Sequence, residues 1–111
     1  MLPKKKRLST ALFKKVISIG NSAHAEFFVV RYIKDKSPLR FAVSVPKKVS
    51  KTAVERNKVR RRIYSAINSF KDLSIENMKV ILIAKPNILK LNTNDMKPYI
   101  KKTFVNLGLL K

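Results

Sequence analysis

The hydrophobic and polar residues of this chain recur with two different periods, and each period predicts its own kind of element. A stripe at helical spacing predicts a first helix from about Ser9, which fits an N-cap, to Ile19, where Gly20 marks the stop. The segments that follow are rich in β-branched and aromatic residues, which favour a pleated surface. The chain is therefore expected to begin with a helix and to continue into a sheet.

Three segments have the pattern of strands. Residues 26–33 are dominated by Phe, Val, Tyr and Ile, and residues 40–45 alternate between apolar and polar side chains. Residues 79–84 are almost continuously apolar, which is typical of a strand that is buried on both faces. The region 22–32 leaves room for one further short strand.

Two more helices are predicted in the second half of the chain. Thr52 and Glu55 have the spacing of a capping box, and the apolar stripe that follows them predicts a helix from Thr52 to about Phe70. A last helix is expected to begin near Asp95, which would place Pro98 in its first turn.

The predicted order is helix, strand, strand, helix, strand, helix, and it defines one α/β (α+β) domain over residues 1–111. A small mixed sheet would pack against helices as a two-layer sandwich. The strand at 40–45, the helix at 52–70 and the strand at 79–84 form a β-α-β unit. Residues 1–7 form a basic arm that we expect to be mobile until it is bound.

The net charge of the chain indicates what kind of partner it binds. The chain has 26 Lys and Arg residues against 6 Asp and Glu residues, a formal net charge of +20. Such self-repulsion destabilises a compact protein, so a polyanionic partner is expected. Nucleic acid is favoured over a membrane, because the apolar runs are too short to span a bilayer. The basic N-terminus is not followed by an apolar signal region, and we therefore expect a cytoplasmic protein.

The composition also excludes most catalytic repertoires. The chain has no cysteine, a single histidine at position 24 and two glycines, Gly20 and Gly108. Thiolate metal sites, histidine clusters and glycine-rich phosphate loops are therefore excluded. Any chemistry that this protein serves is expected to be performed by a partner.

The strongest candidate site is the basic run at 56–62 in the second predicted helix. Arg60 flanks the buried stripe and Arg56 lies near its apolar edge. Four side chains point away from the stripe: Asn57, Lys58, Arg61 and Arg62. Cations near a helix N-terminus oppose the helix dipole, so a bound phosphate backbone is the simplest compensation. A solvated face that only keeps the protein soluble is the alternative, but the cluster has one sign and follows Lys47, Lys48 and Lys51.

The segment 41–63 reads Phe-Ala-Val-Ser-Val-Pro-Lys-Lys-Val-Ser-Lys-Thr-Ala-Val-Glu-Arg-Asn-Lys-Val-Arg-Arg-Arg-Ile, and it resembles the signature of the bacterial ribonuclease P protein family. That signature is a strand, a Lys-Lys loop and a helix with an Arg-Asn-Arg motif. By this resemblance Arg56 and Asn57 take the first two motif positions, and Lys58 stands in place of the second Arg. The upstream residues Arg7-Leu8, Phe13, Val16, Ile17 and Gly20 are similar to the family's first-helix pattern.

The resemblance implies a protein subunit of an endoribonuclease, which binds the catalytic RNA subunit and the 5′ leader of precursor tRNA and assists metal-dependent removal of that leader. The residues implied to bind the RNA subunit are Lys47, Lys48, Arg56, Asn57, Lys58, Arg60, Arg61 and Arg62. The residues implied to bind the leader are Phe13, Ile17, Arg31 and Arg40.

The resemblance also implies that the RNA performs the catalysis and holds most of the Mg²⁺, with no catalytic residue in the protein. Asn57 is a candidate for indirect coordination of a metal ion. No protein partner is evident from the sequence. The implied fold resembles ribosomal-protein domains and contains a left-handed β-α-β crossover, which is the rare hand for such units.

Several alternatives stay open on the sequence alone. Tyr64 stands where the family usually has a basic residue, so it either shortens the basic stripe or adds a stacking surface. Phe13 is a core residue or a stacking platform. The resemblance implies that a cleft between the first helix and the sheet holds the leader, and Arg31 and Arg40 either line this leader cleft or point into solvent. At the level of function, the rivals are a structural ribosomal RNA-binding protein and a DNA-binding module that reads the major groove with the helix at 52–70.

Overall fold

A computed structural model describes residues 10–34, 40–70 and 78–106 of the chain. The basic arm at 1–7, the predicted cap Ser9 and Gly108 lie outside these ranges. The elements follow the order α1 (Thr10–Ile19), β1 (Asn21–His24), β2 (Phe28–Lys34), β3 (Arg40–Ser44), α2 (Ala53–Asn68), β4 (Met78–Ala84), the 3₁₀ helix η2 (Pro86–Lys90) and α3 (Thr93–Asn106).

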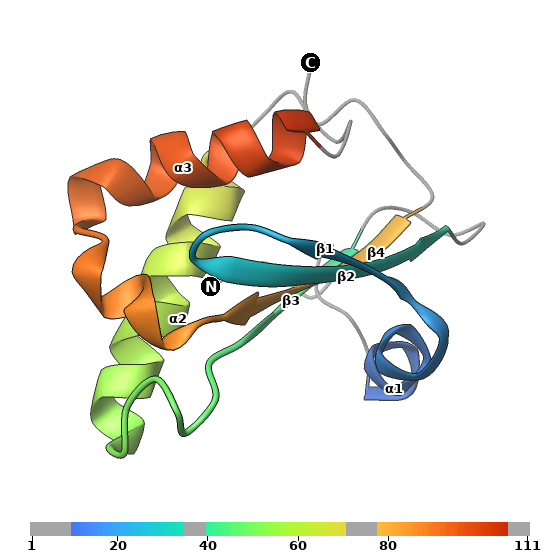
Figure 1. Ribbon diagram of the computed structural model, residues 1–111, viewed down its shortest axis with the longest axis horizontal. Helices are drawn as coiled ribbons and strands as arrows, with labels where there is room; N and C mark the ends of the chain where they lie inside the picture. The colour runs from blue at the N-terminus through green and yellow to red at the C-terminus, as the bar shows by residue number, and fades with distance from the viewer. Residues whose placement is uncertain (1–9, 35–39, 71–77, 107–111) are drawn as a thin grey trace.

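The described strands form one mixed sheet in the order β1-β2-β4-β3 (Figure 1). β4 is antiparallel to β2 and parallel to β3, so the most apolar strand lies in the middle of the sheet. This confirms the β-α-β unit, in which α2 connects the parallel pair. β1 is the further short strand that the sequence left room for, and it pairs with β2 as a hairpin. The left hand of the crossover stays a prediction.

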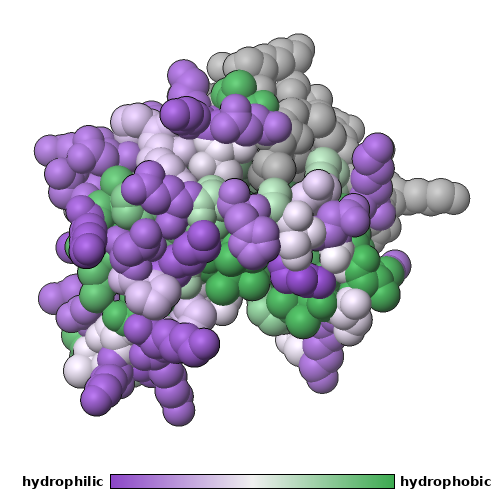
Figure 2. All heavy atoms as spheres, in the orientation of Figure 1, coloured by the Kyte–Doolittle hydropathy of each residue, from purple (hydrophilic) through white to green (hydrophobic). Residues whose placement is uncertain are grey.

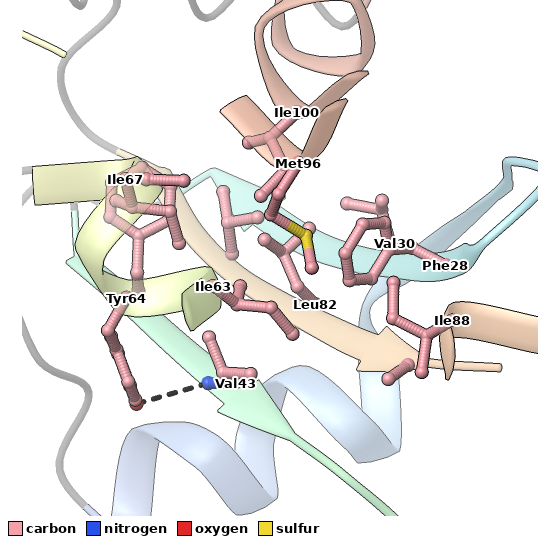
Figure 3. Packing of buried hydrophobic residues seen from close by; sticks show 14 of the residues in the cluster. Phe28, Val30, Val43, Ile63, Tyr64, Ile67, Leu82, Ile88, Met96 and Ile100 are labelled. Carbon is pink, nitrogen blue, oxygen red and sulfur yellow. Dashed lines mark hydrogen bonds between the residues drawn. The ribbon is translucent and has the colours of Figure 1, made fainter. Parts of the chain in front are cut away.

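The main hydrophobic core lies between one face of the sheet and the two helices α2 and α3 (Figures 1 and 3). Ile63 and Ile67 of α2 and Ile100 of α3 meet Val43 and Leu82 of the sheet there. One end of this core is aromatic. There Phe104 of α3 stacks on Phe41 of β3 with ring centroids 5.4 Å apart. The two-layer sandwich is therefore built from these two helices and the sheet.

α1 covers part of the opposite face of the sheet, so that helices lie on both sides (Figure 1). Val16 is its buried anchor, and it packs against Ile33 of β2 and Ile81 of β4. The helix ends at Ile19, as predicted, but the reason for Gly20 differs. A Cβ atom at Gly20 would lie 2.3 Å from the Val16 carbonyl oxygen. Close packing of the backbone, rather than a left-handed conformation, therefore requires glycine here.

The last helix begins two residues earlier than the sequence predicted. α3 begins at Thr93 because Asn92 caps it, with its Oδ1 accepting a hydrogen bond from the Asp95 N–H at 3.0 Å. Pro98 consequently lies inside the helix and beyond its first turn, so that expectation was wrong. Pro98 has no N–H, so one hydrogen bond of the helix is not made at this residue, which lies on the exposed side of the helix.

Candidate nucleic-acid interface

The orientation of α2 is fixed at its N-terminus and along its apolar stripe. Thr52 Oγ1 accepts a hydrogen bond from the Glu55 N–H at 3.3 Å, which is half of the predicted capping box. The Thr52 N–H donates instead to Ser50 Oγ, also at 3.3 Å. Val59 and Ile63 are buried in the core, so the opposite side of the helix faces solvent.

That outer side carries the basic residues in the arrangement that the sequence predicted. Asn57, Lys58, Arg61 and Arg62 are exposed, and Arg60 is half-buried and donates to Asn57 Oδ1 at 2.7 Å. Within residues 10–34, 40–70 and 78–106, the side chains of Lys58, Arg61 and Arg62 have no hydrogen-bond or ion-pair partner. We call Asn57, Lys58, Arg60, Arg61 and Arg62 the α2 face. Hydrophilic side chains gather on this side of the molecule (Figure 2).

Arg56, the first residue of the motif, is turned toward the protein. Its side chain is half-buried, and Nη1 donates to the Ser50 carbonyl oxygen at 2.8 Å. Ser50 follows a turn that is closed by a hydrogen bond from the Val49 N–H to the Pro46 carbonyl, and this turn carries the exposed Lys47 and Lys48. Arg56 therefore ties the Lys-Lys loop to the start of α2, so that both basic segments have a fixed relative position.

Tyr64 belongs to the core and not to the α2 face. Its side chain is 6% exposed, and its hydroxyl accepts a hydrogen bond from the Val43 N–H at 3.2 Å (Figure 3). The ring is therefore not available as a stacking surface. Of the two alternatives that the sequence left open at this position, the shorter basic stripe is the one that the structure supports.

The proposed leader-binding residues lie on the face of the sheet that α1 covers. Phe13 is half-buried and packs against the cluster of Val16, Ile33 and Ile81, so its ring serves the core and keeps one exposed side. Ile17, one turn further along α1, is 40% exposed. Phe13 and Ile17 are four residues apart and thus form an apolar strip along one side of α1, at its border with the sheet.

Arg31 has a structural role that the sequence did not reveal. Its guanidinium donates to the Ile17 carbonyl at 2.7 Å, the Gly20 carbonyl at 3.1 Å and Ser22 Oγ at 2.8 Å. It therefore satisfies the last carbonyls of α1 and places a positive charge at the negative end of the helix dipole. The side chain therefore does not simply point into solvent, and its role in lining the leader cleft stays a prediction.

Arg40 and Arg31 lie on the same face of the sheet, but on opposite sides of the central strand β4. β4 separates their strands, so the two backbones are about 10 Å apart across the sheet. Lys79 of β4 is in register with Arg40, and its side chain is 0% exposed. The sequence pattern did not predict that this lysine is buried. Lysine is almost never fully buried, and this burial inside an apolar run is the signal that a sequence alone does not give.

The described residues do not form a metal site. No group of three or more His, Asp or Glu side chains lies together in the part of the chain that the structure describes. Asn57 Oδ1, the one oxygen proposed for indirect coordination, accepts a hydrogen bond from Arg60 and is surrounded by cations. A divalent ion directly bound by these side chains is therefore disfavoured. No helix among the described residues is long and apolar enough to cross a membrane.

The mixed four-stranded sheet and the unpaired basic face of α2 place this chain among small α+β proteins with a cationic helix surface. The family model described as Ribonuclease P matches residues 2–108. The chain belongs to this family. The ribonuclease P protein component of Pediococcus pentosaceus is 36% identical over 100 residues, which cover 87% of this chain and 82% of that protein.

Solved structures agree with this assignment. An RNase P protein from Staphylococcus aureus superposes with a TM-score of 0.82 at 25% sequence identity, covering 96% of this chain and 98% of that chain. The RNase P protein from Thermotoga maritima superposes with a TM-score of 0.73 at 20% identity, covering 91% of this chain and 93% of that one, and at this identity it supports the fold alone.

Proposed function

We propose that this chain is the cytoplasmic protein subunit of ribonuclease P, and that it assists removal of the 5′ leader from precursor tRNA. In this proposal the α2 face and the Lys47–Lys48 loop bind the catalytic RNA subunit. The side of α1 that carries Phe13 and Ile17, together with the adjoining sheet face, binds the leader. The RNA subunit performs the hydrolysis.

The unpaired cations of the α2 face are the observation that carries the proposal. Arg61 and Arg62 are exposed, lack protein partners among the described residues, and stand on a helix whose other side is locked into the core. Unpaired guanidinium groups on a rigid element suit the phosphate oxygens of a folded RNA, because they donate in a planar fork. The long-range charge of the chain would also steer it toward RNA.

For the leader, the described side chains favour stacking and general electrostatic attraction over a dedicated phosphate clamp. Phe13 and Ile17 offer an apolar strip on α1, and single-stranded bases stack on such surfaces without sequence preference. Arg31 is engaged with α1, so we assign it the positioning of that helix. Of the residues implied to bind the leader, Arg40 is therefore the cation that we assign to the leader phosphates.

We place the Mg²⁺ ions mainly with the RNA subunit, as the resemblance to the family implies. The protein's contribution is then electrostatic. It lowers the repulsion between two RNA molecules, and this allows them to associate at a lower concentration of divalent ions.

The test is cleavage of precursor tRNA by ribonuclease P RNA at low Mg²⁺, with and without the purified protein. The protein is expected to raise the cleavage rate at the mature 5′ end. It should also strengthen binding of precursor tRNA more than binding of mature tRNA, which has no leader. Absence of any stimulation would contradict the proposal.

The same preparation separates the two rival functions. A structural ribosomal protein would bind a ribosomal RNA fragment more tightly than ribonuclease P RNA and would not stimulate cleavage. A DNA-binding module would be displaced from RNA by duplex DNA at comparable concentration. Both competitions are measured at one fixed salt concentration, since binding of this kind depends steeply on salt.

A further inference from the structure

A hollow between α2 and α3 lies next to the α2 face and has a strongly basic rim. It measures about 360 Å³ and opens to solvent between the two helices. Its polar lining consists of Arg61, Arg62 and Ser65 from α2, the C-cap residue Ser69, and Thr93 and Lys97 from α3. Nothing in the sequence pattern singled out Lys97, which is separated from Arg61 by more than thirty residues.

We propose that this hollow is a second phosphate-binding site that receives the backbone of the RNA bound on the α2 face. The inference rests on the proposed function, because it takes RNA as the partner of α2. It adds α3 to the interface and assigns Lys97 as a contact residue.

The electrostatics of the hollow favour an anion. Arg61, Arg62 and Lys97 are exposed, and their side chains have no partner among the residues that the structure describes. Asp95 lies close by in the chain, but no ion pair joins it to these cations. Three like charges that line one hollow repel one another, and a phosphate bound in the hollow would reduce that repulsion.

The position of the rim is fixed by the core beneath it. Met96, next to Lys97, is buried, as is Ala66 on the opposite wall. Deeper in the same helix pair, Phe104 of α3 contacts Phe70 at the end of α2 with ring centroids 5.7 Å apart. The backbone positions that carry Arg61 and Lys97 are thus set by packing that is independent of any ligand, and this reduces the reorganisation that binding of a phosphate requires.

Continuity with the α2 face favours an RNA backbone over a free small anion. Arg61 and Arg62 each lie three or four residues from both Lys58 and Ser65, so these four side chains form one strip on the helix surface. The strip leads from the α2 face into the hollow. A phosphate backbone that follows the strip would enter the hollow, where the hydroxyl groups of Ser65 and Thr93 can donate to its oxygens, whereas the Ser69 hydroxyl already donates to the Ala66 carbonyl at 2.6 Å.

α3 also supplies a matched control. Lys102 lines a different hollow, of about 280 Å³, between α3 and the β1–β2 hairpin. Lys97 and Lys102 are both exposed on the same helix, so Lys97→Gln and Lys102→Gln remove the same charge from the same element. Neither substitution is expected to change the urea midpoint of unfolding, and that measurement verifies that both variants fold.

The experiment measures binding to ribonuclease P RNA, and to an unrelated structured RNA of equal length, as a function of salt. Lys97→Gln should weaken binding roughly three- to tenfold and reduce the slope of log K against log[salt] by about 0.7–0.9, the value of one lost phosphate contact. Lys102→Gln should keep the wild-type slope. Arg61→Gln combined with Lys97→Gln should be less damaging than the product of the two single effects, because both side chains contact the same phosphate.

The two proposals fail in different ways. If the wild-type protein does not prefer ribonuclease P RNA to the unrelated RNA, the proposed function is wrong. The salt slopes of the two lysine variants are then compared on the RNA that does bind. If Lys97→Gln and Lys102→Gln have the same slope on that RNA, the second site is wrong. Binding of inorganic phosphate that Lys97→Gln abolishes, without any change in RNA affinity, would also overturn it and leave a small-anion site only.

Discussion

The hydroxyl of Tyr64 accepts a hydrogen bond from the backbone N–H of Val43 at 3.2 Å, and this contact joins α2 to the edge strand β3. β3 has a neighbouring strand on one side only. The helix that carries the basic face is therefore attached to the sheet by a polar contact as well as by its apolar stripe.

Replacement of Tyr64 by Phe should lower the free energy of unfolding by about 1–2 kcal/mol, because the buried Val43 N–H loses its acceptor. Urea unfolding measures the change. RNA affinity is expected to stay at the wild-type value, since the ring lies in the core. Weaker RNA binding at unchanged stability would contradict this assignment and would make Tyr64 a contact residue.

Arg31→Gln should destabilise the protein by roughly 1–3 kcal/mol, because carbonyls at the end of α1 lose a charged donor. Ser22→Ala removes only one of the hydrogen bonds of Arg31 and should have a smaller effect. Thermal or urea unfolding of both variants tests this order. A different outcome, with normal stability and reduced affinity for precursor tRNA alone, would instead assign Arg31 to the leader.

Arg56→Met keeps the length of the side chain but removes the donor to the Ser50 carbonyl. The turn that carries Lys47 and Lys48 should then open more often, and hydrogen exchange of the Val49 N–H should become faster. RNA affinity should fall as a consequence. Arg62→Met is the control, since Arg62 has no partner within the described chain and its loss should weaken RNA binding without changing Val49 exchange.

Arg60 and Arg61 are adjacent in the sequence but differ in their contacts. Arg60 donates to Asn57 Oδ1, whereas Arg61 has no partner among the described residues. Arg61→Ala should reduce the salt slope of RNA binding by about 0.7–0.9 and leave stability within about 0.5 kcal/mol of wild type. Arg60→Ala should reduce it as well, and it also frees Asn57 Oδ1 from its hydrogen bond. Unchanged slopes in both variants would mean that the α2 face is not the RNA contact surface.

The sequence predicted the elements of this fold well where one period dominated. The continuous apolar run at 79–84 correctly indicated a strand buried on both faces, and the capping signal at Thr52 located the start of α2. The beginning of α3 was placed too late because Pro98 was read as a first-turn residue, whereas Asn92 provides the cap. An Asn cap without a following Glu or Gln is a weaker signal in a sequence than a proline is.

The site was predictable to the extent that helix periodicity decides exposure. The outward direction of Lys58, Arg61 and Arg62 follows from their positions relative to Val59. The partners of Arg31 and Arg56 were not predictable, because each donates to a backbone carbonyl whose location depends on the folded chain. The placement of Lys97 beside Arg61 likewise depends on how α3 crosses α2.

The strand order has a consequence for how the protein is made. β2 and β3 are synthesised early but are held apart by β4, which is the last strand to leave the ribosome and pairs with both. Among the described strands, β1 and β2 can pair before β4 is synthesised, whereas β3 gains its partner only with β4. Until then α2 lacks the complete sheet on which it buries its apolar stripe. We therefore expect a chain that is interrupted before Ala84 to lack the support on which the α2 face depends.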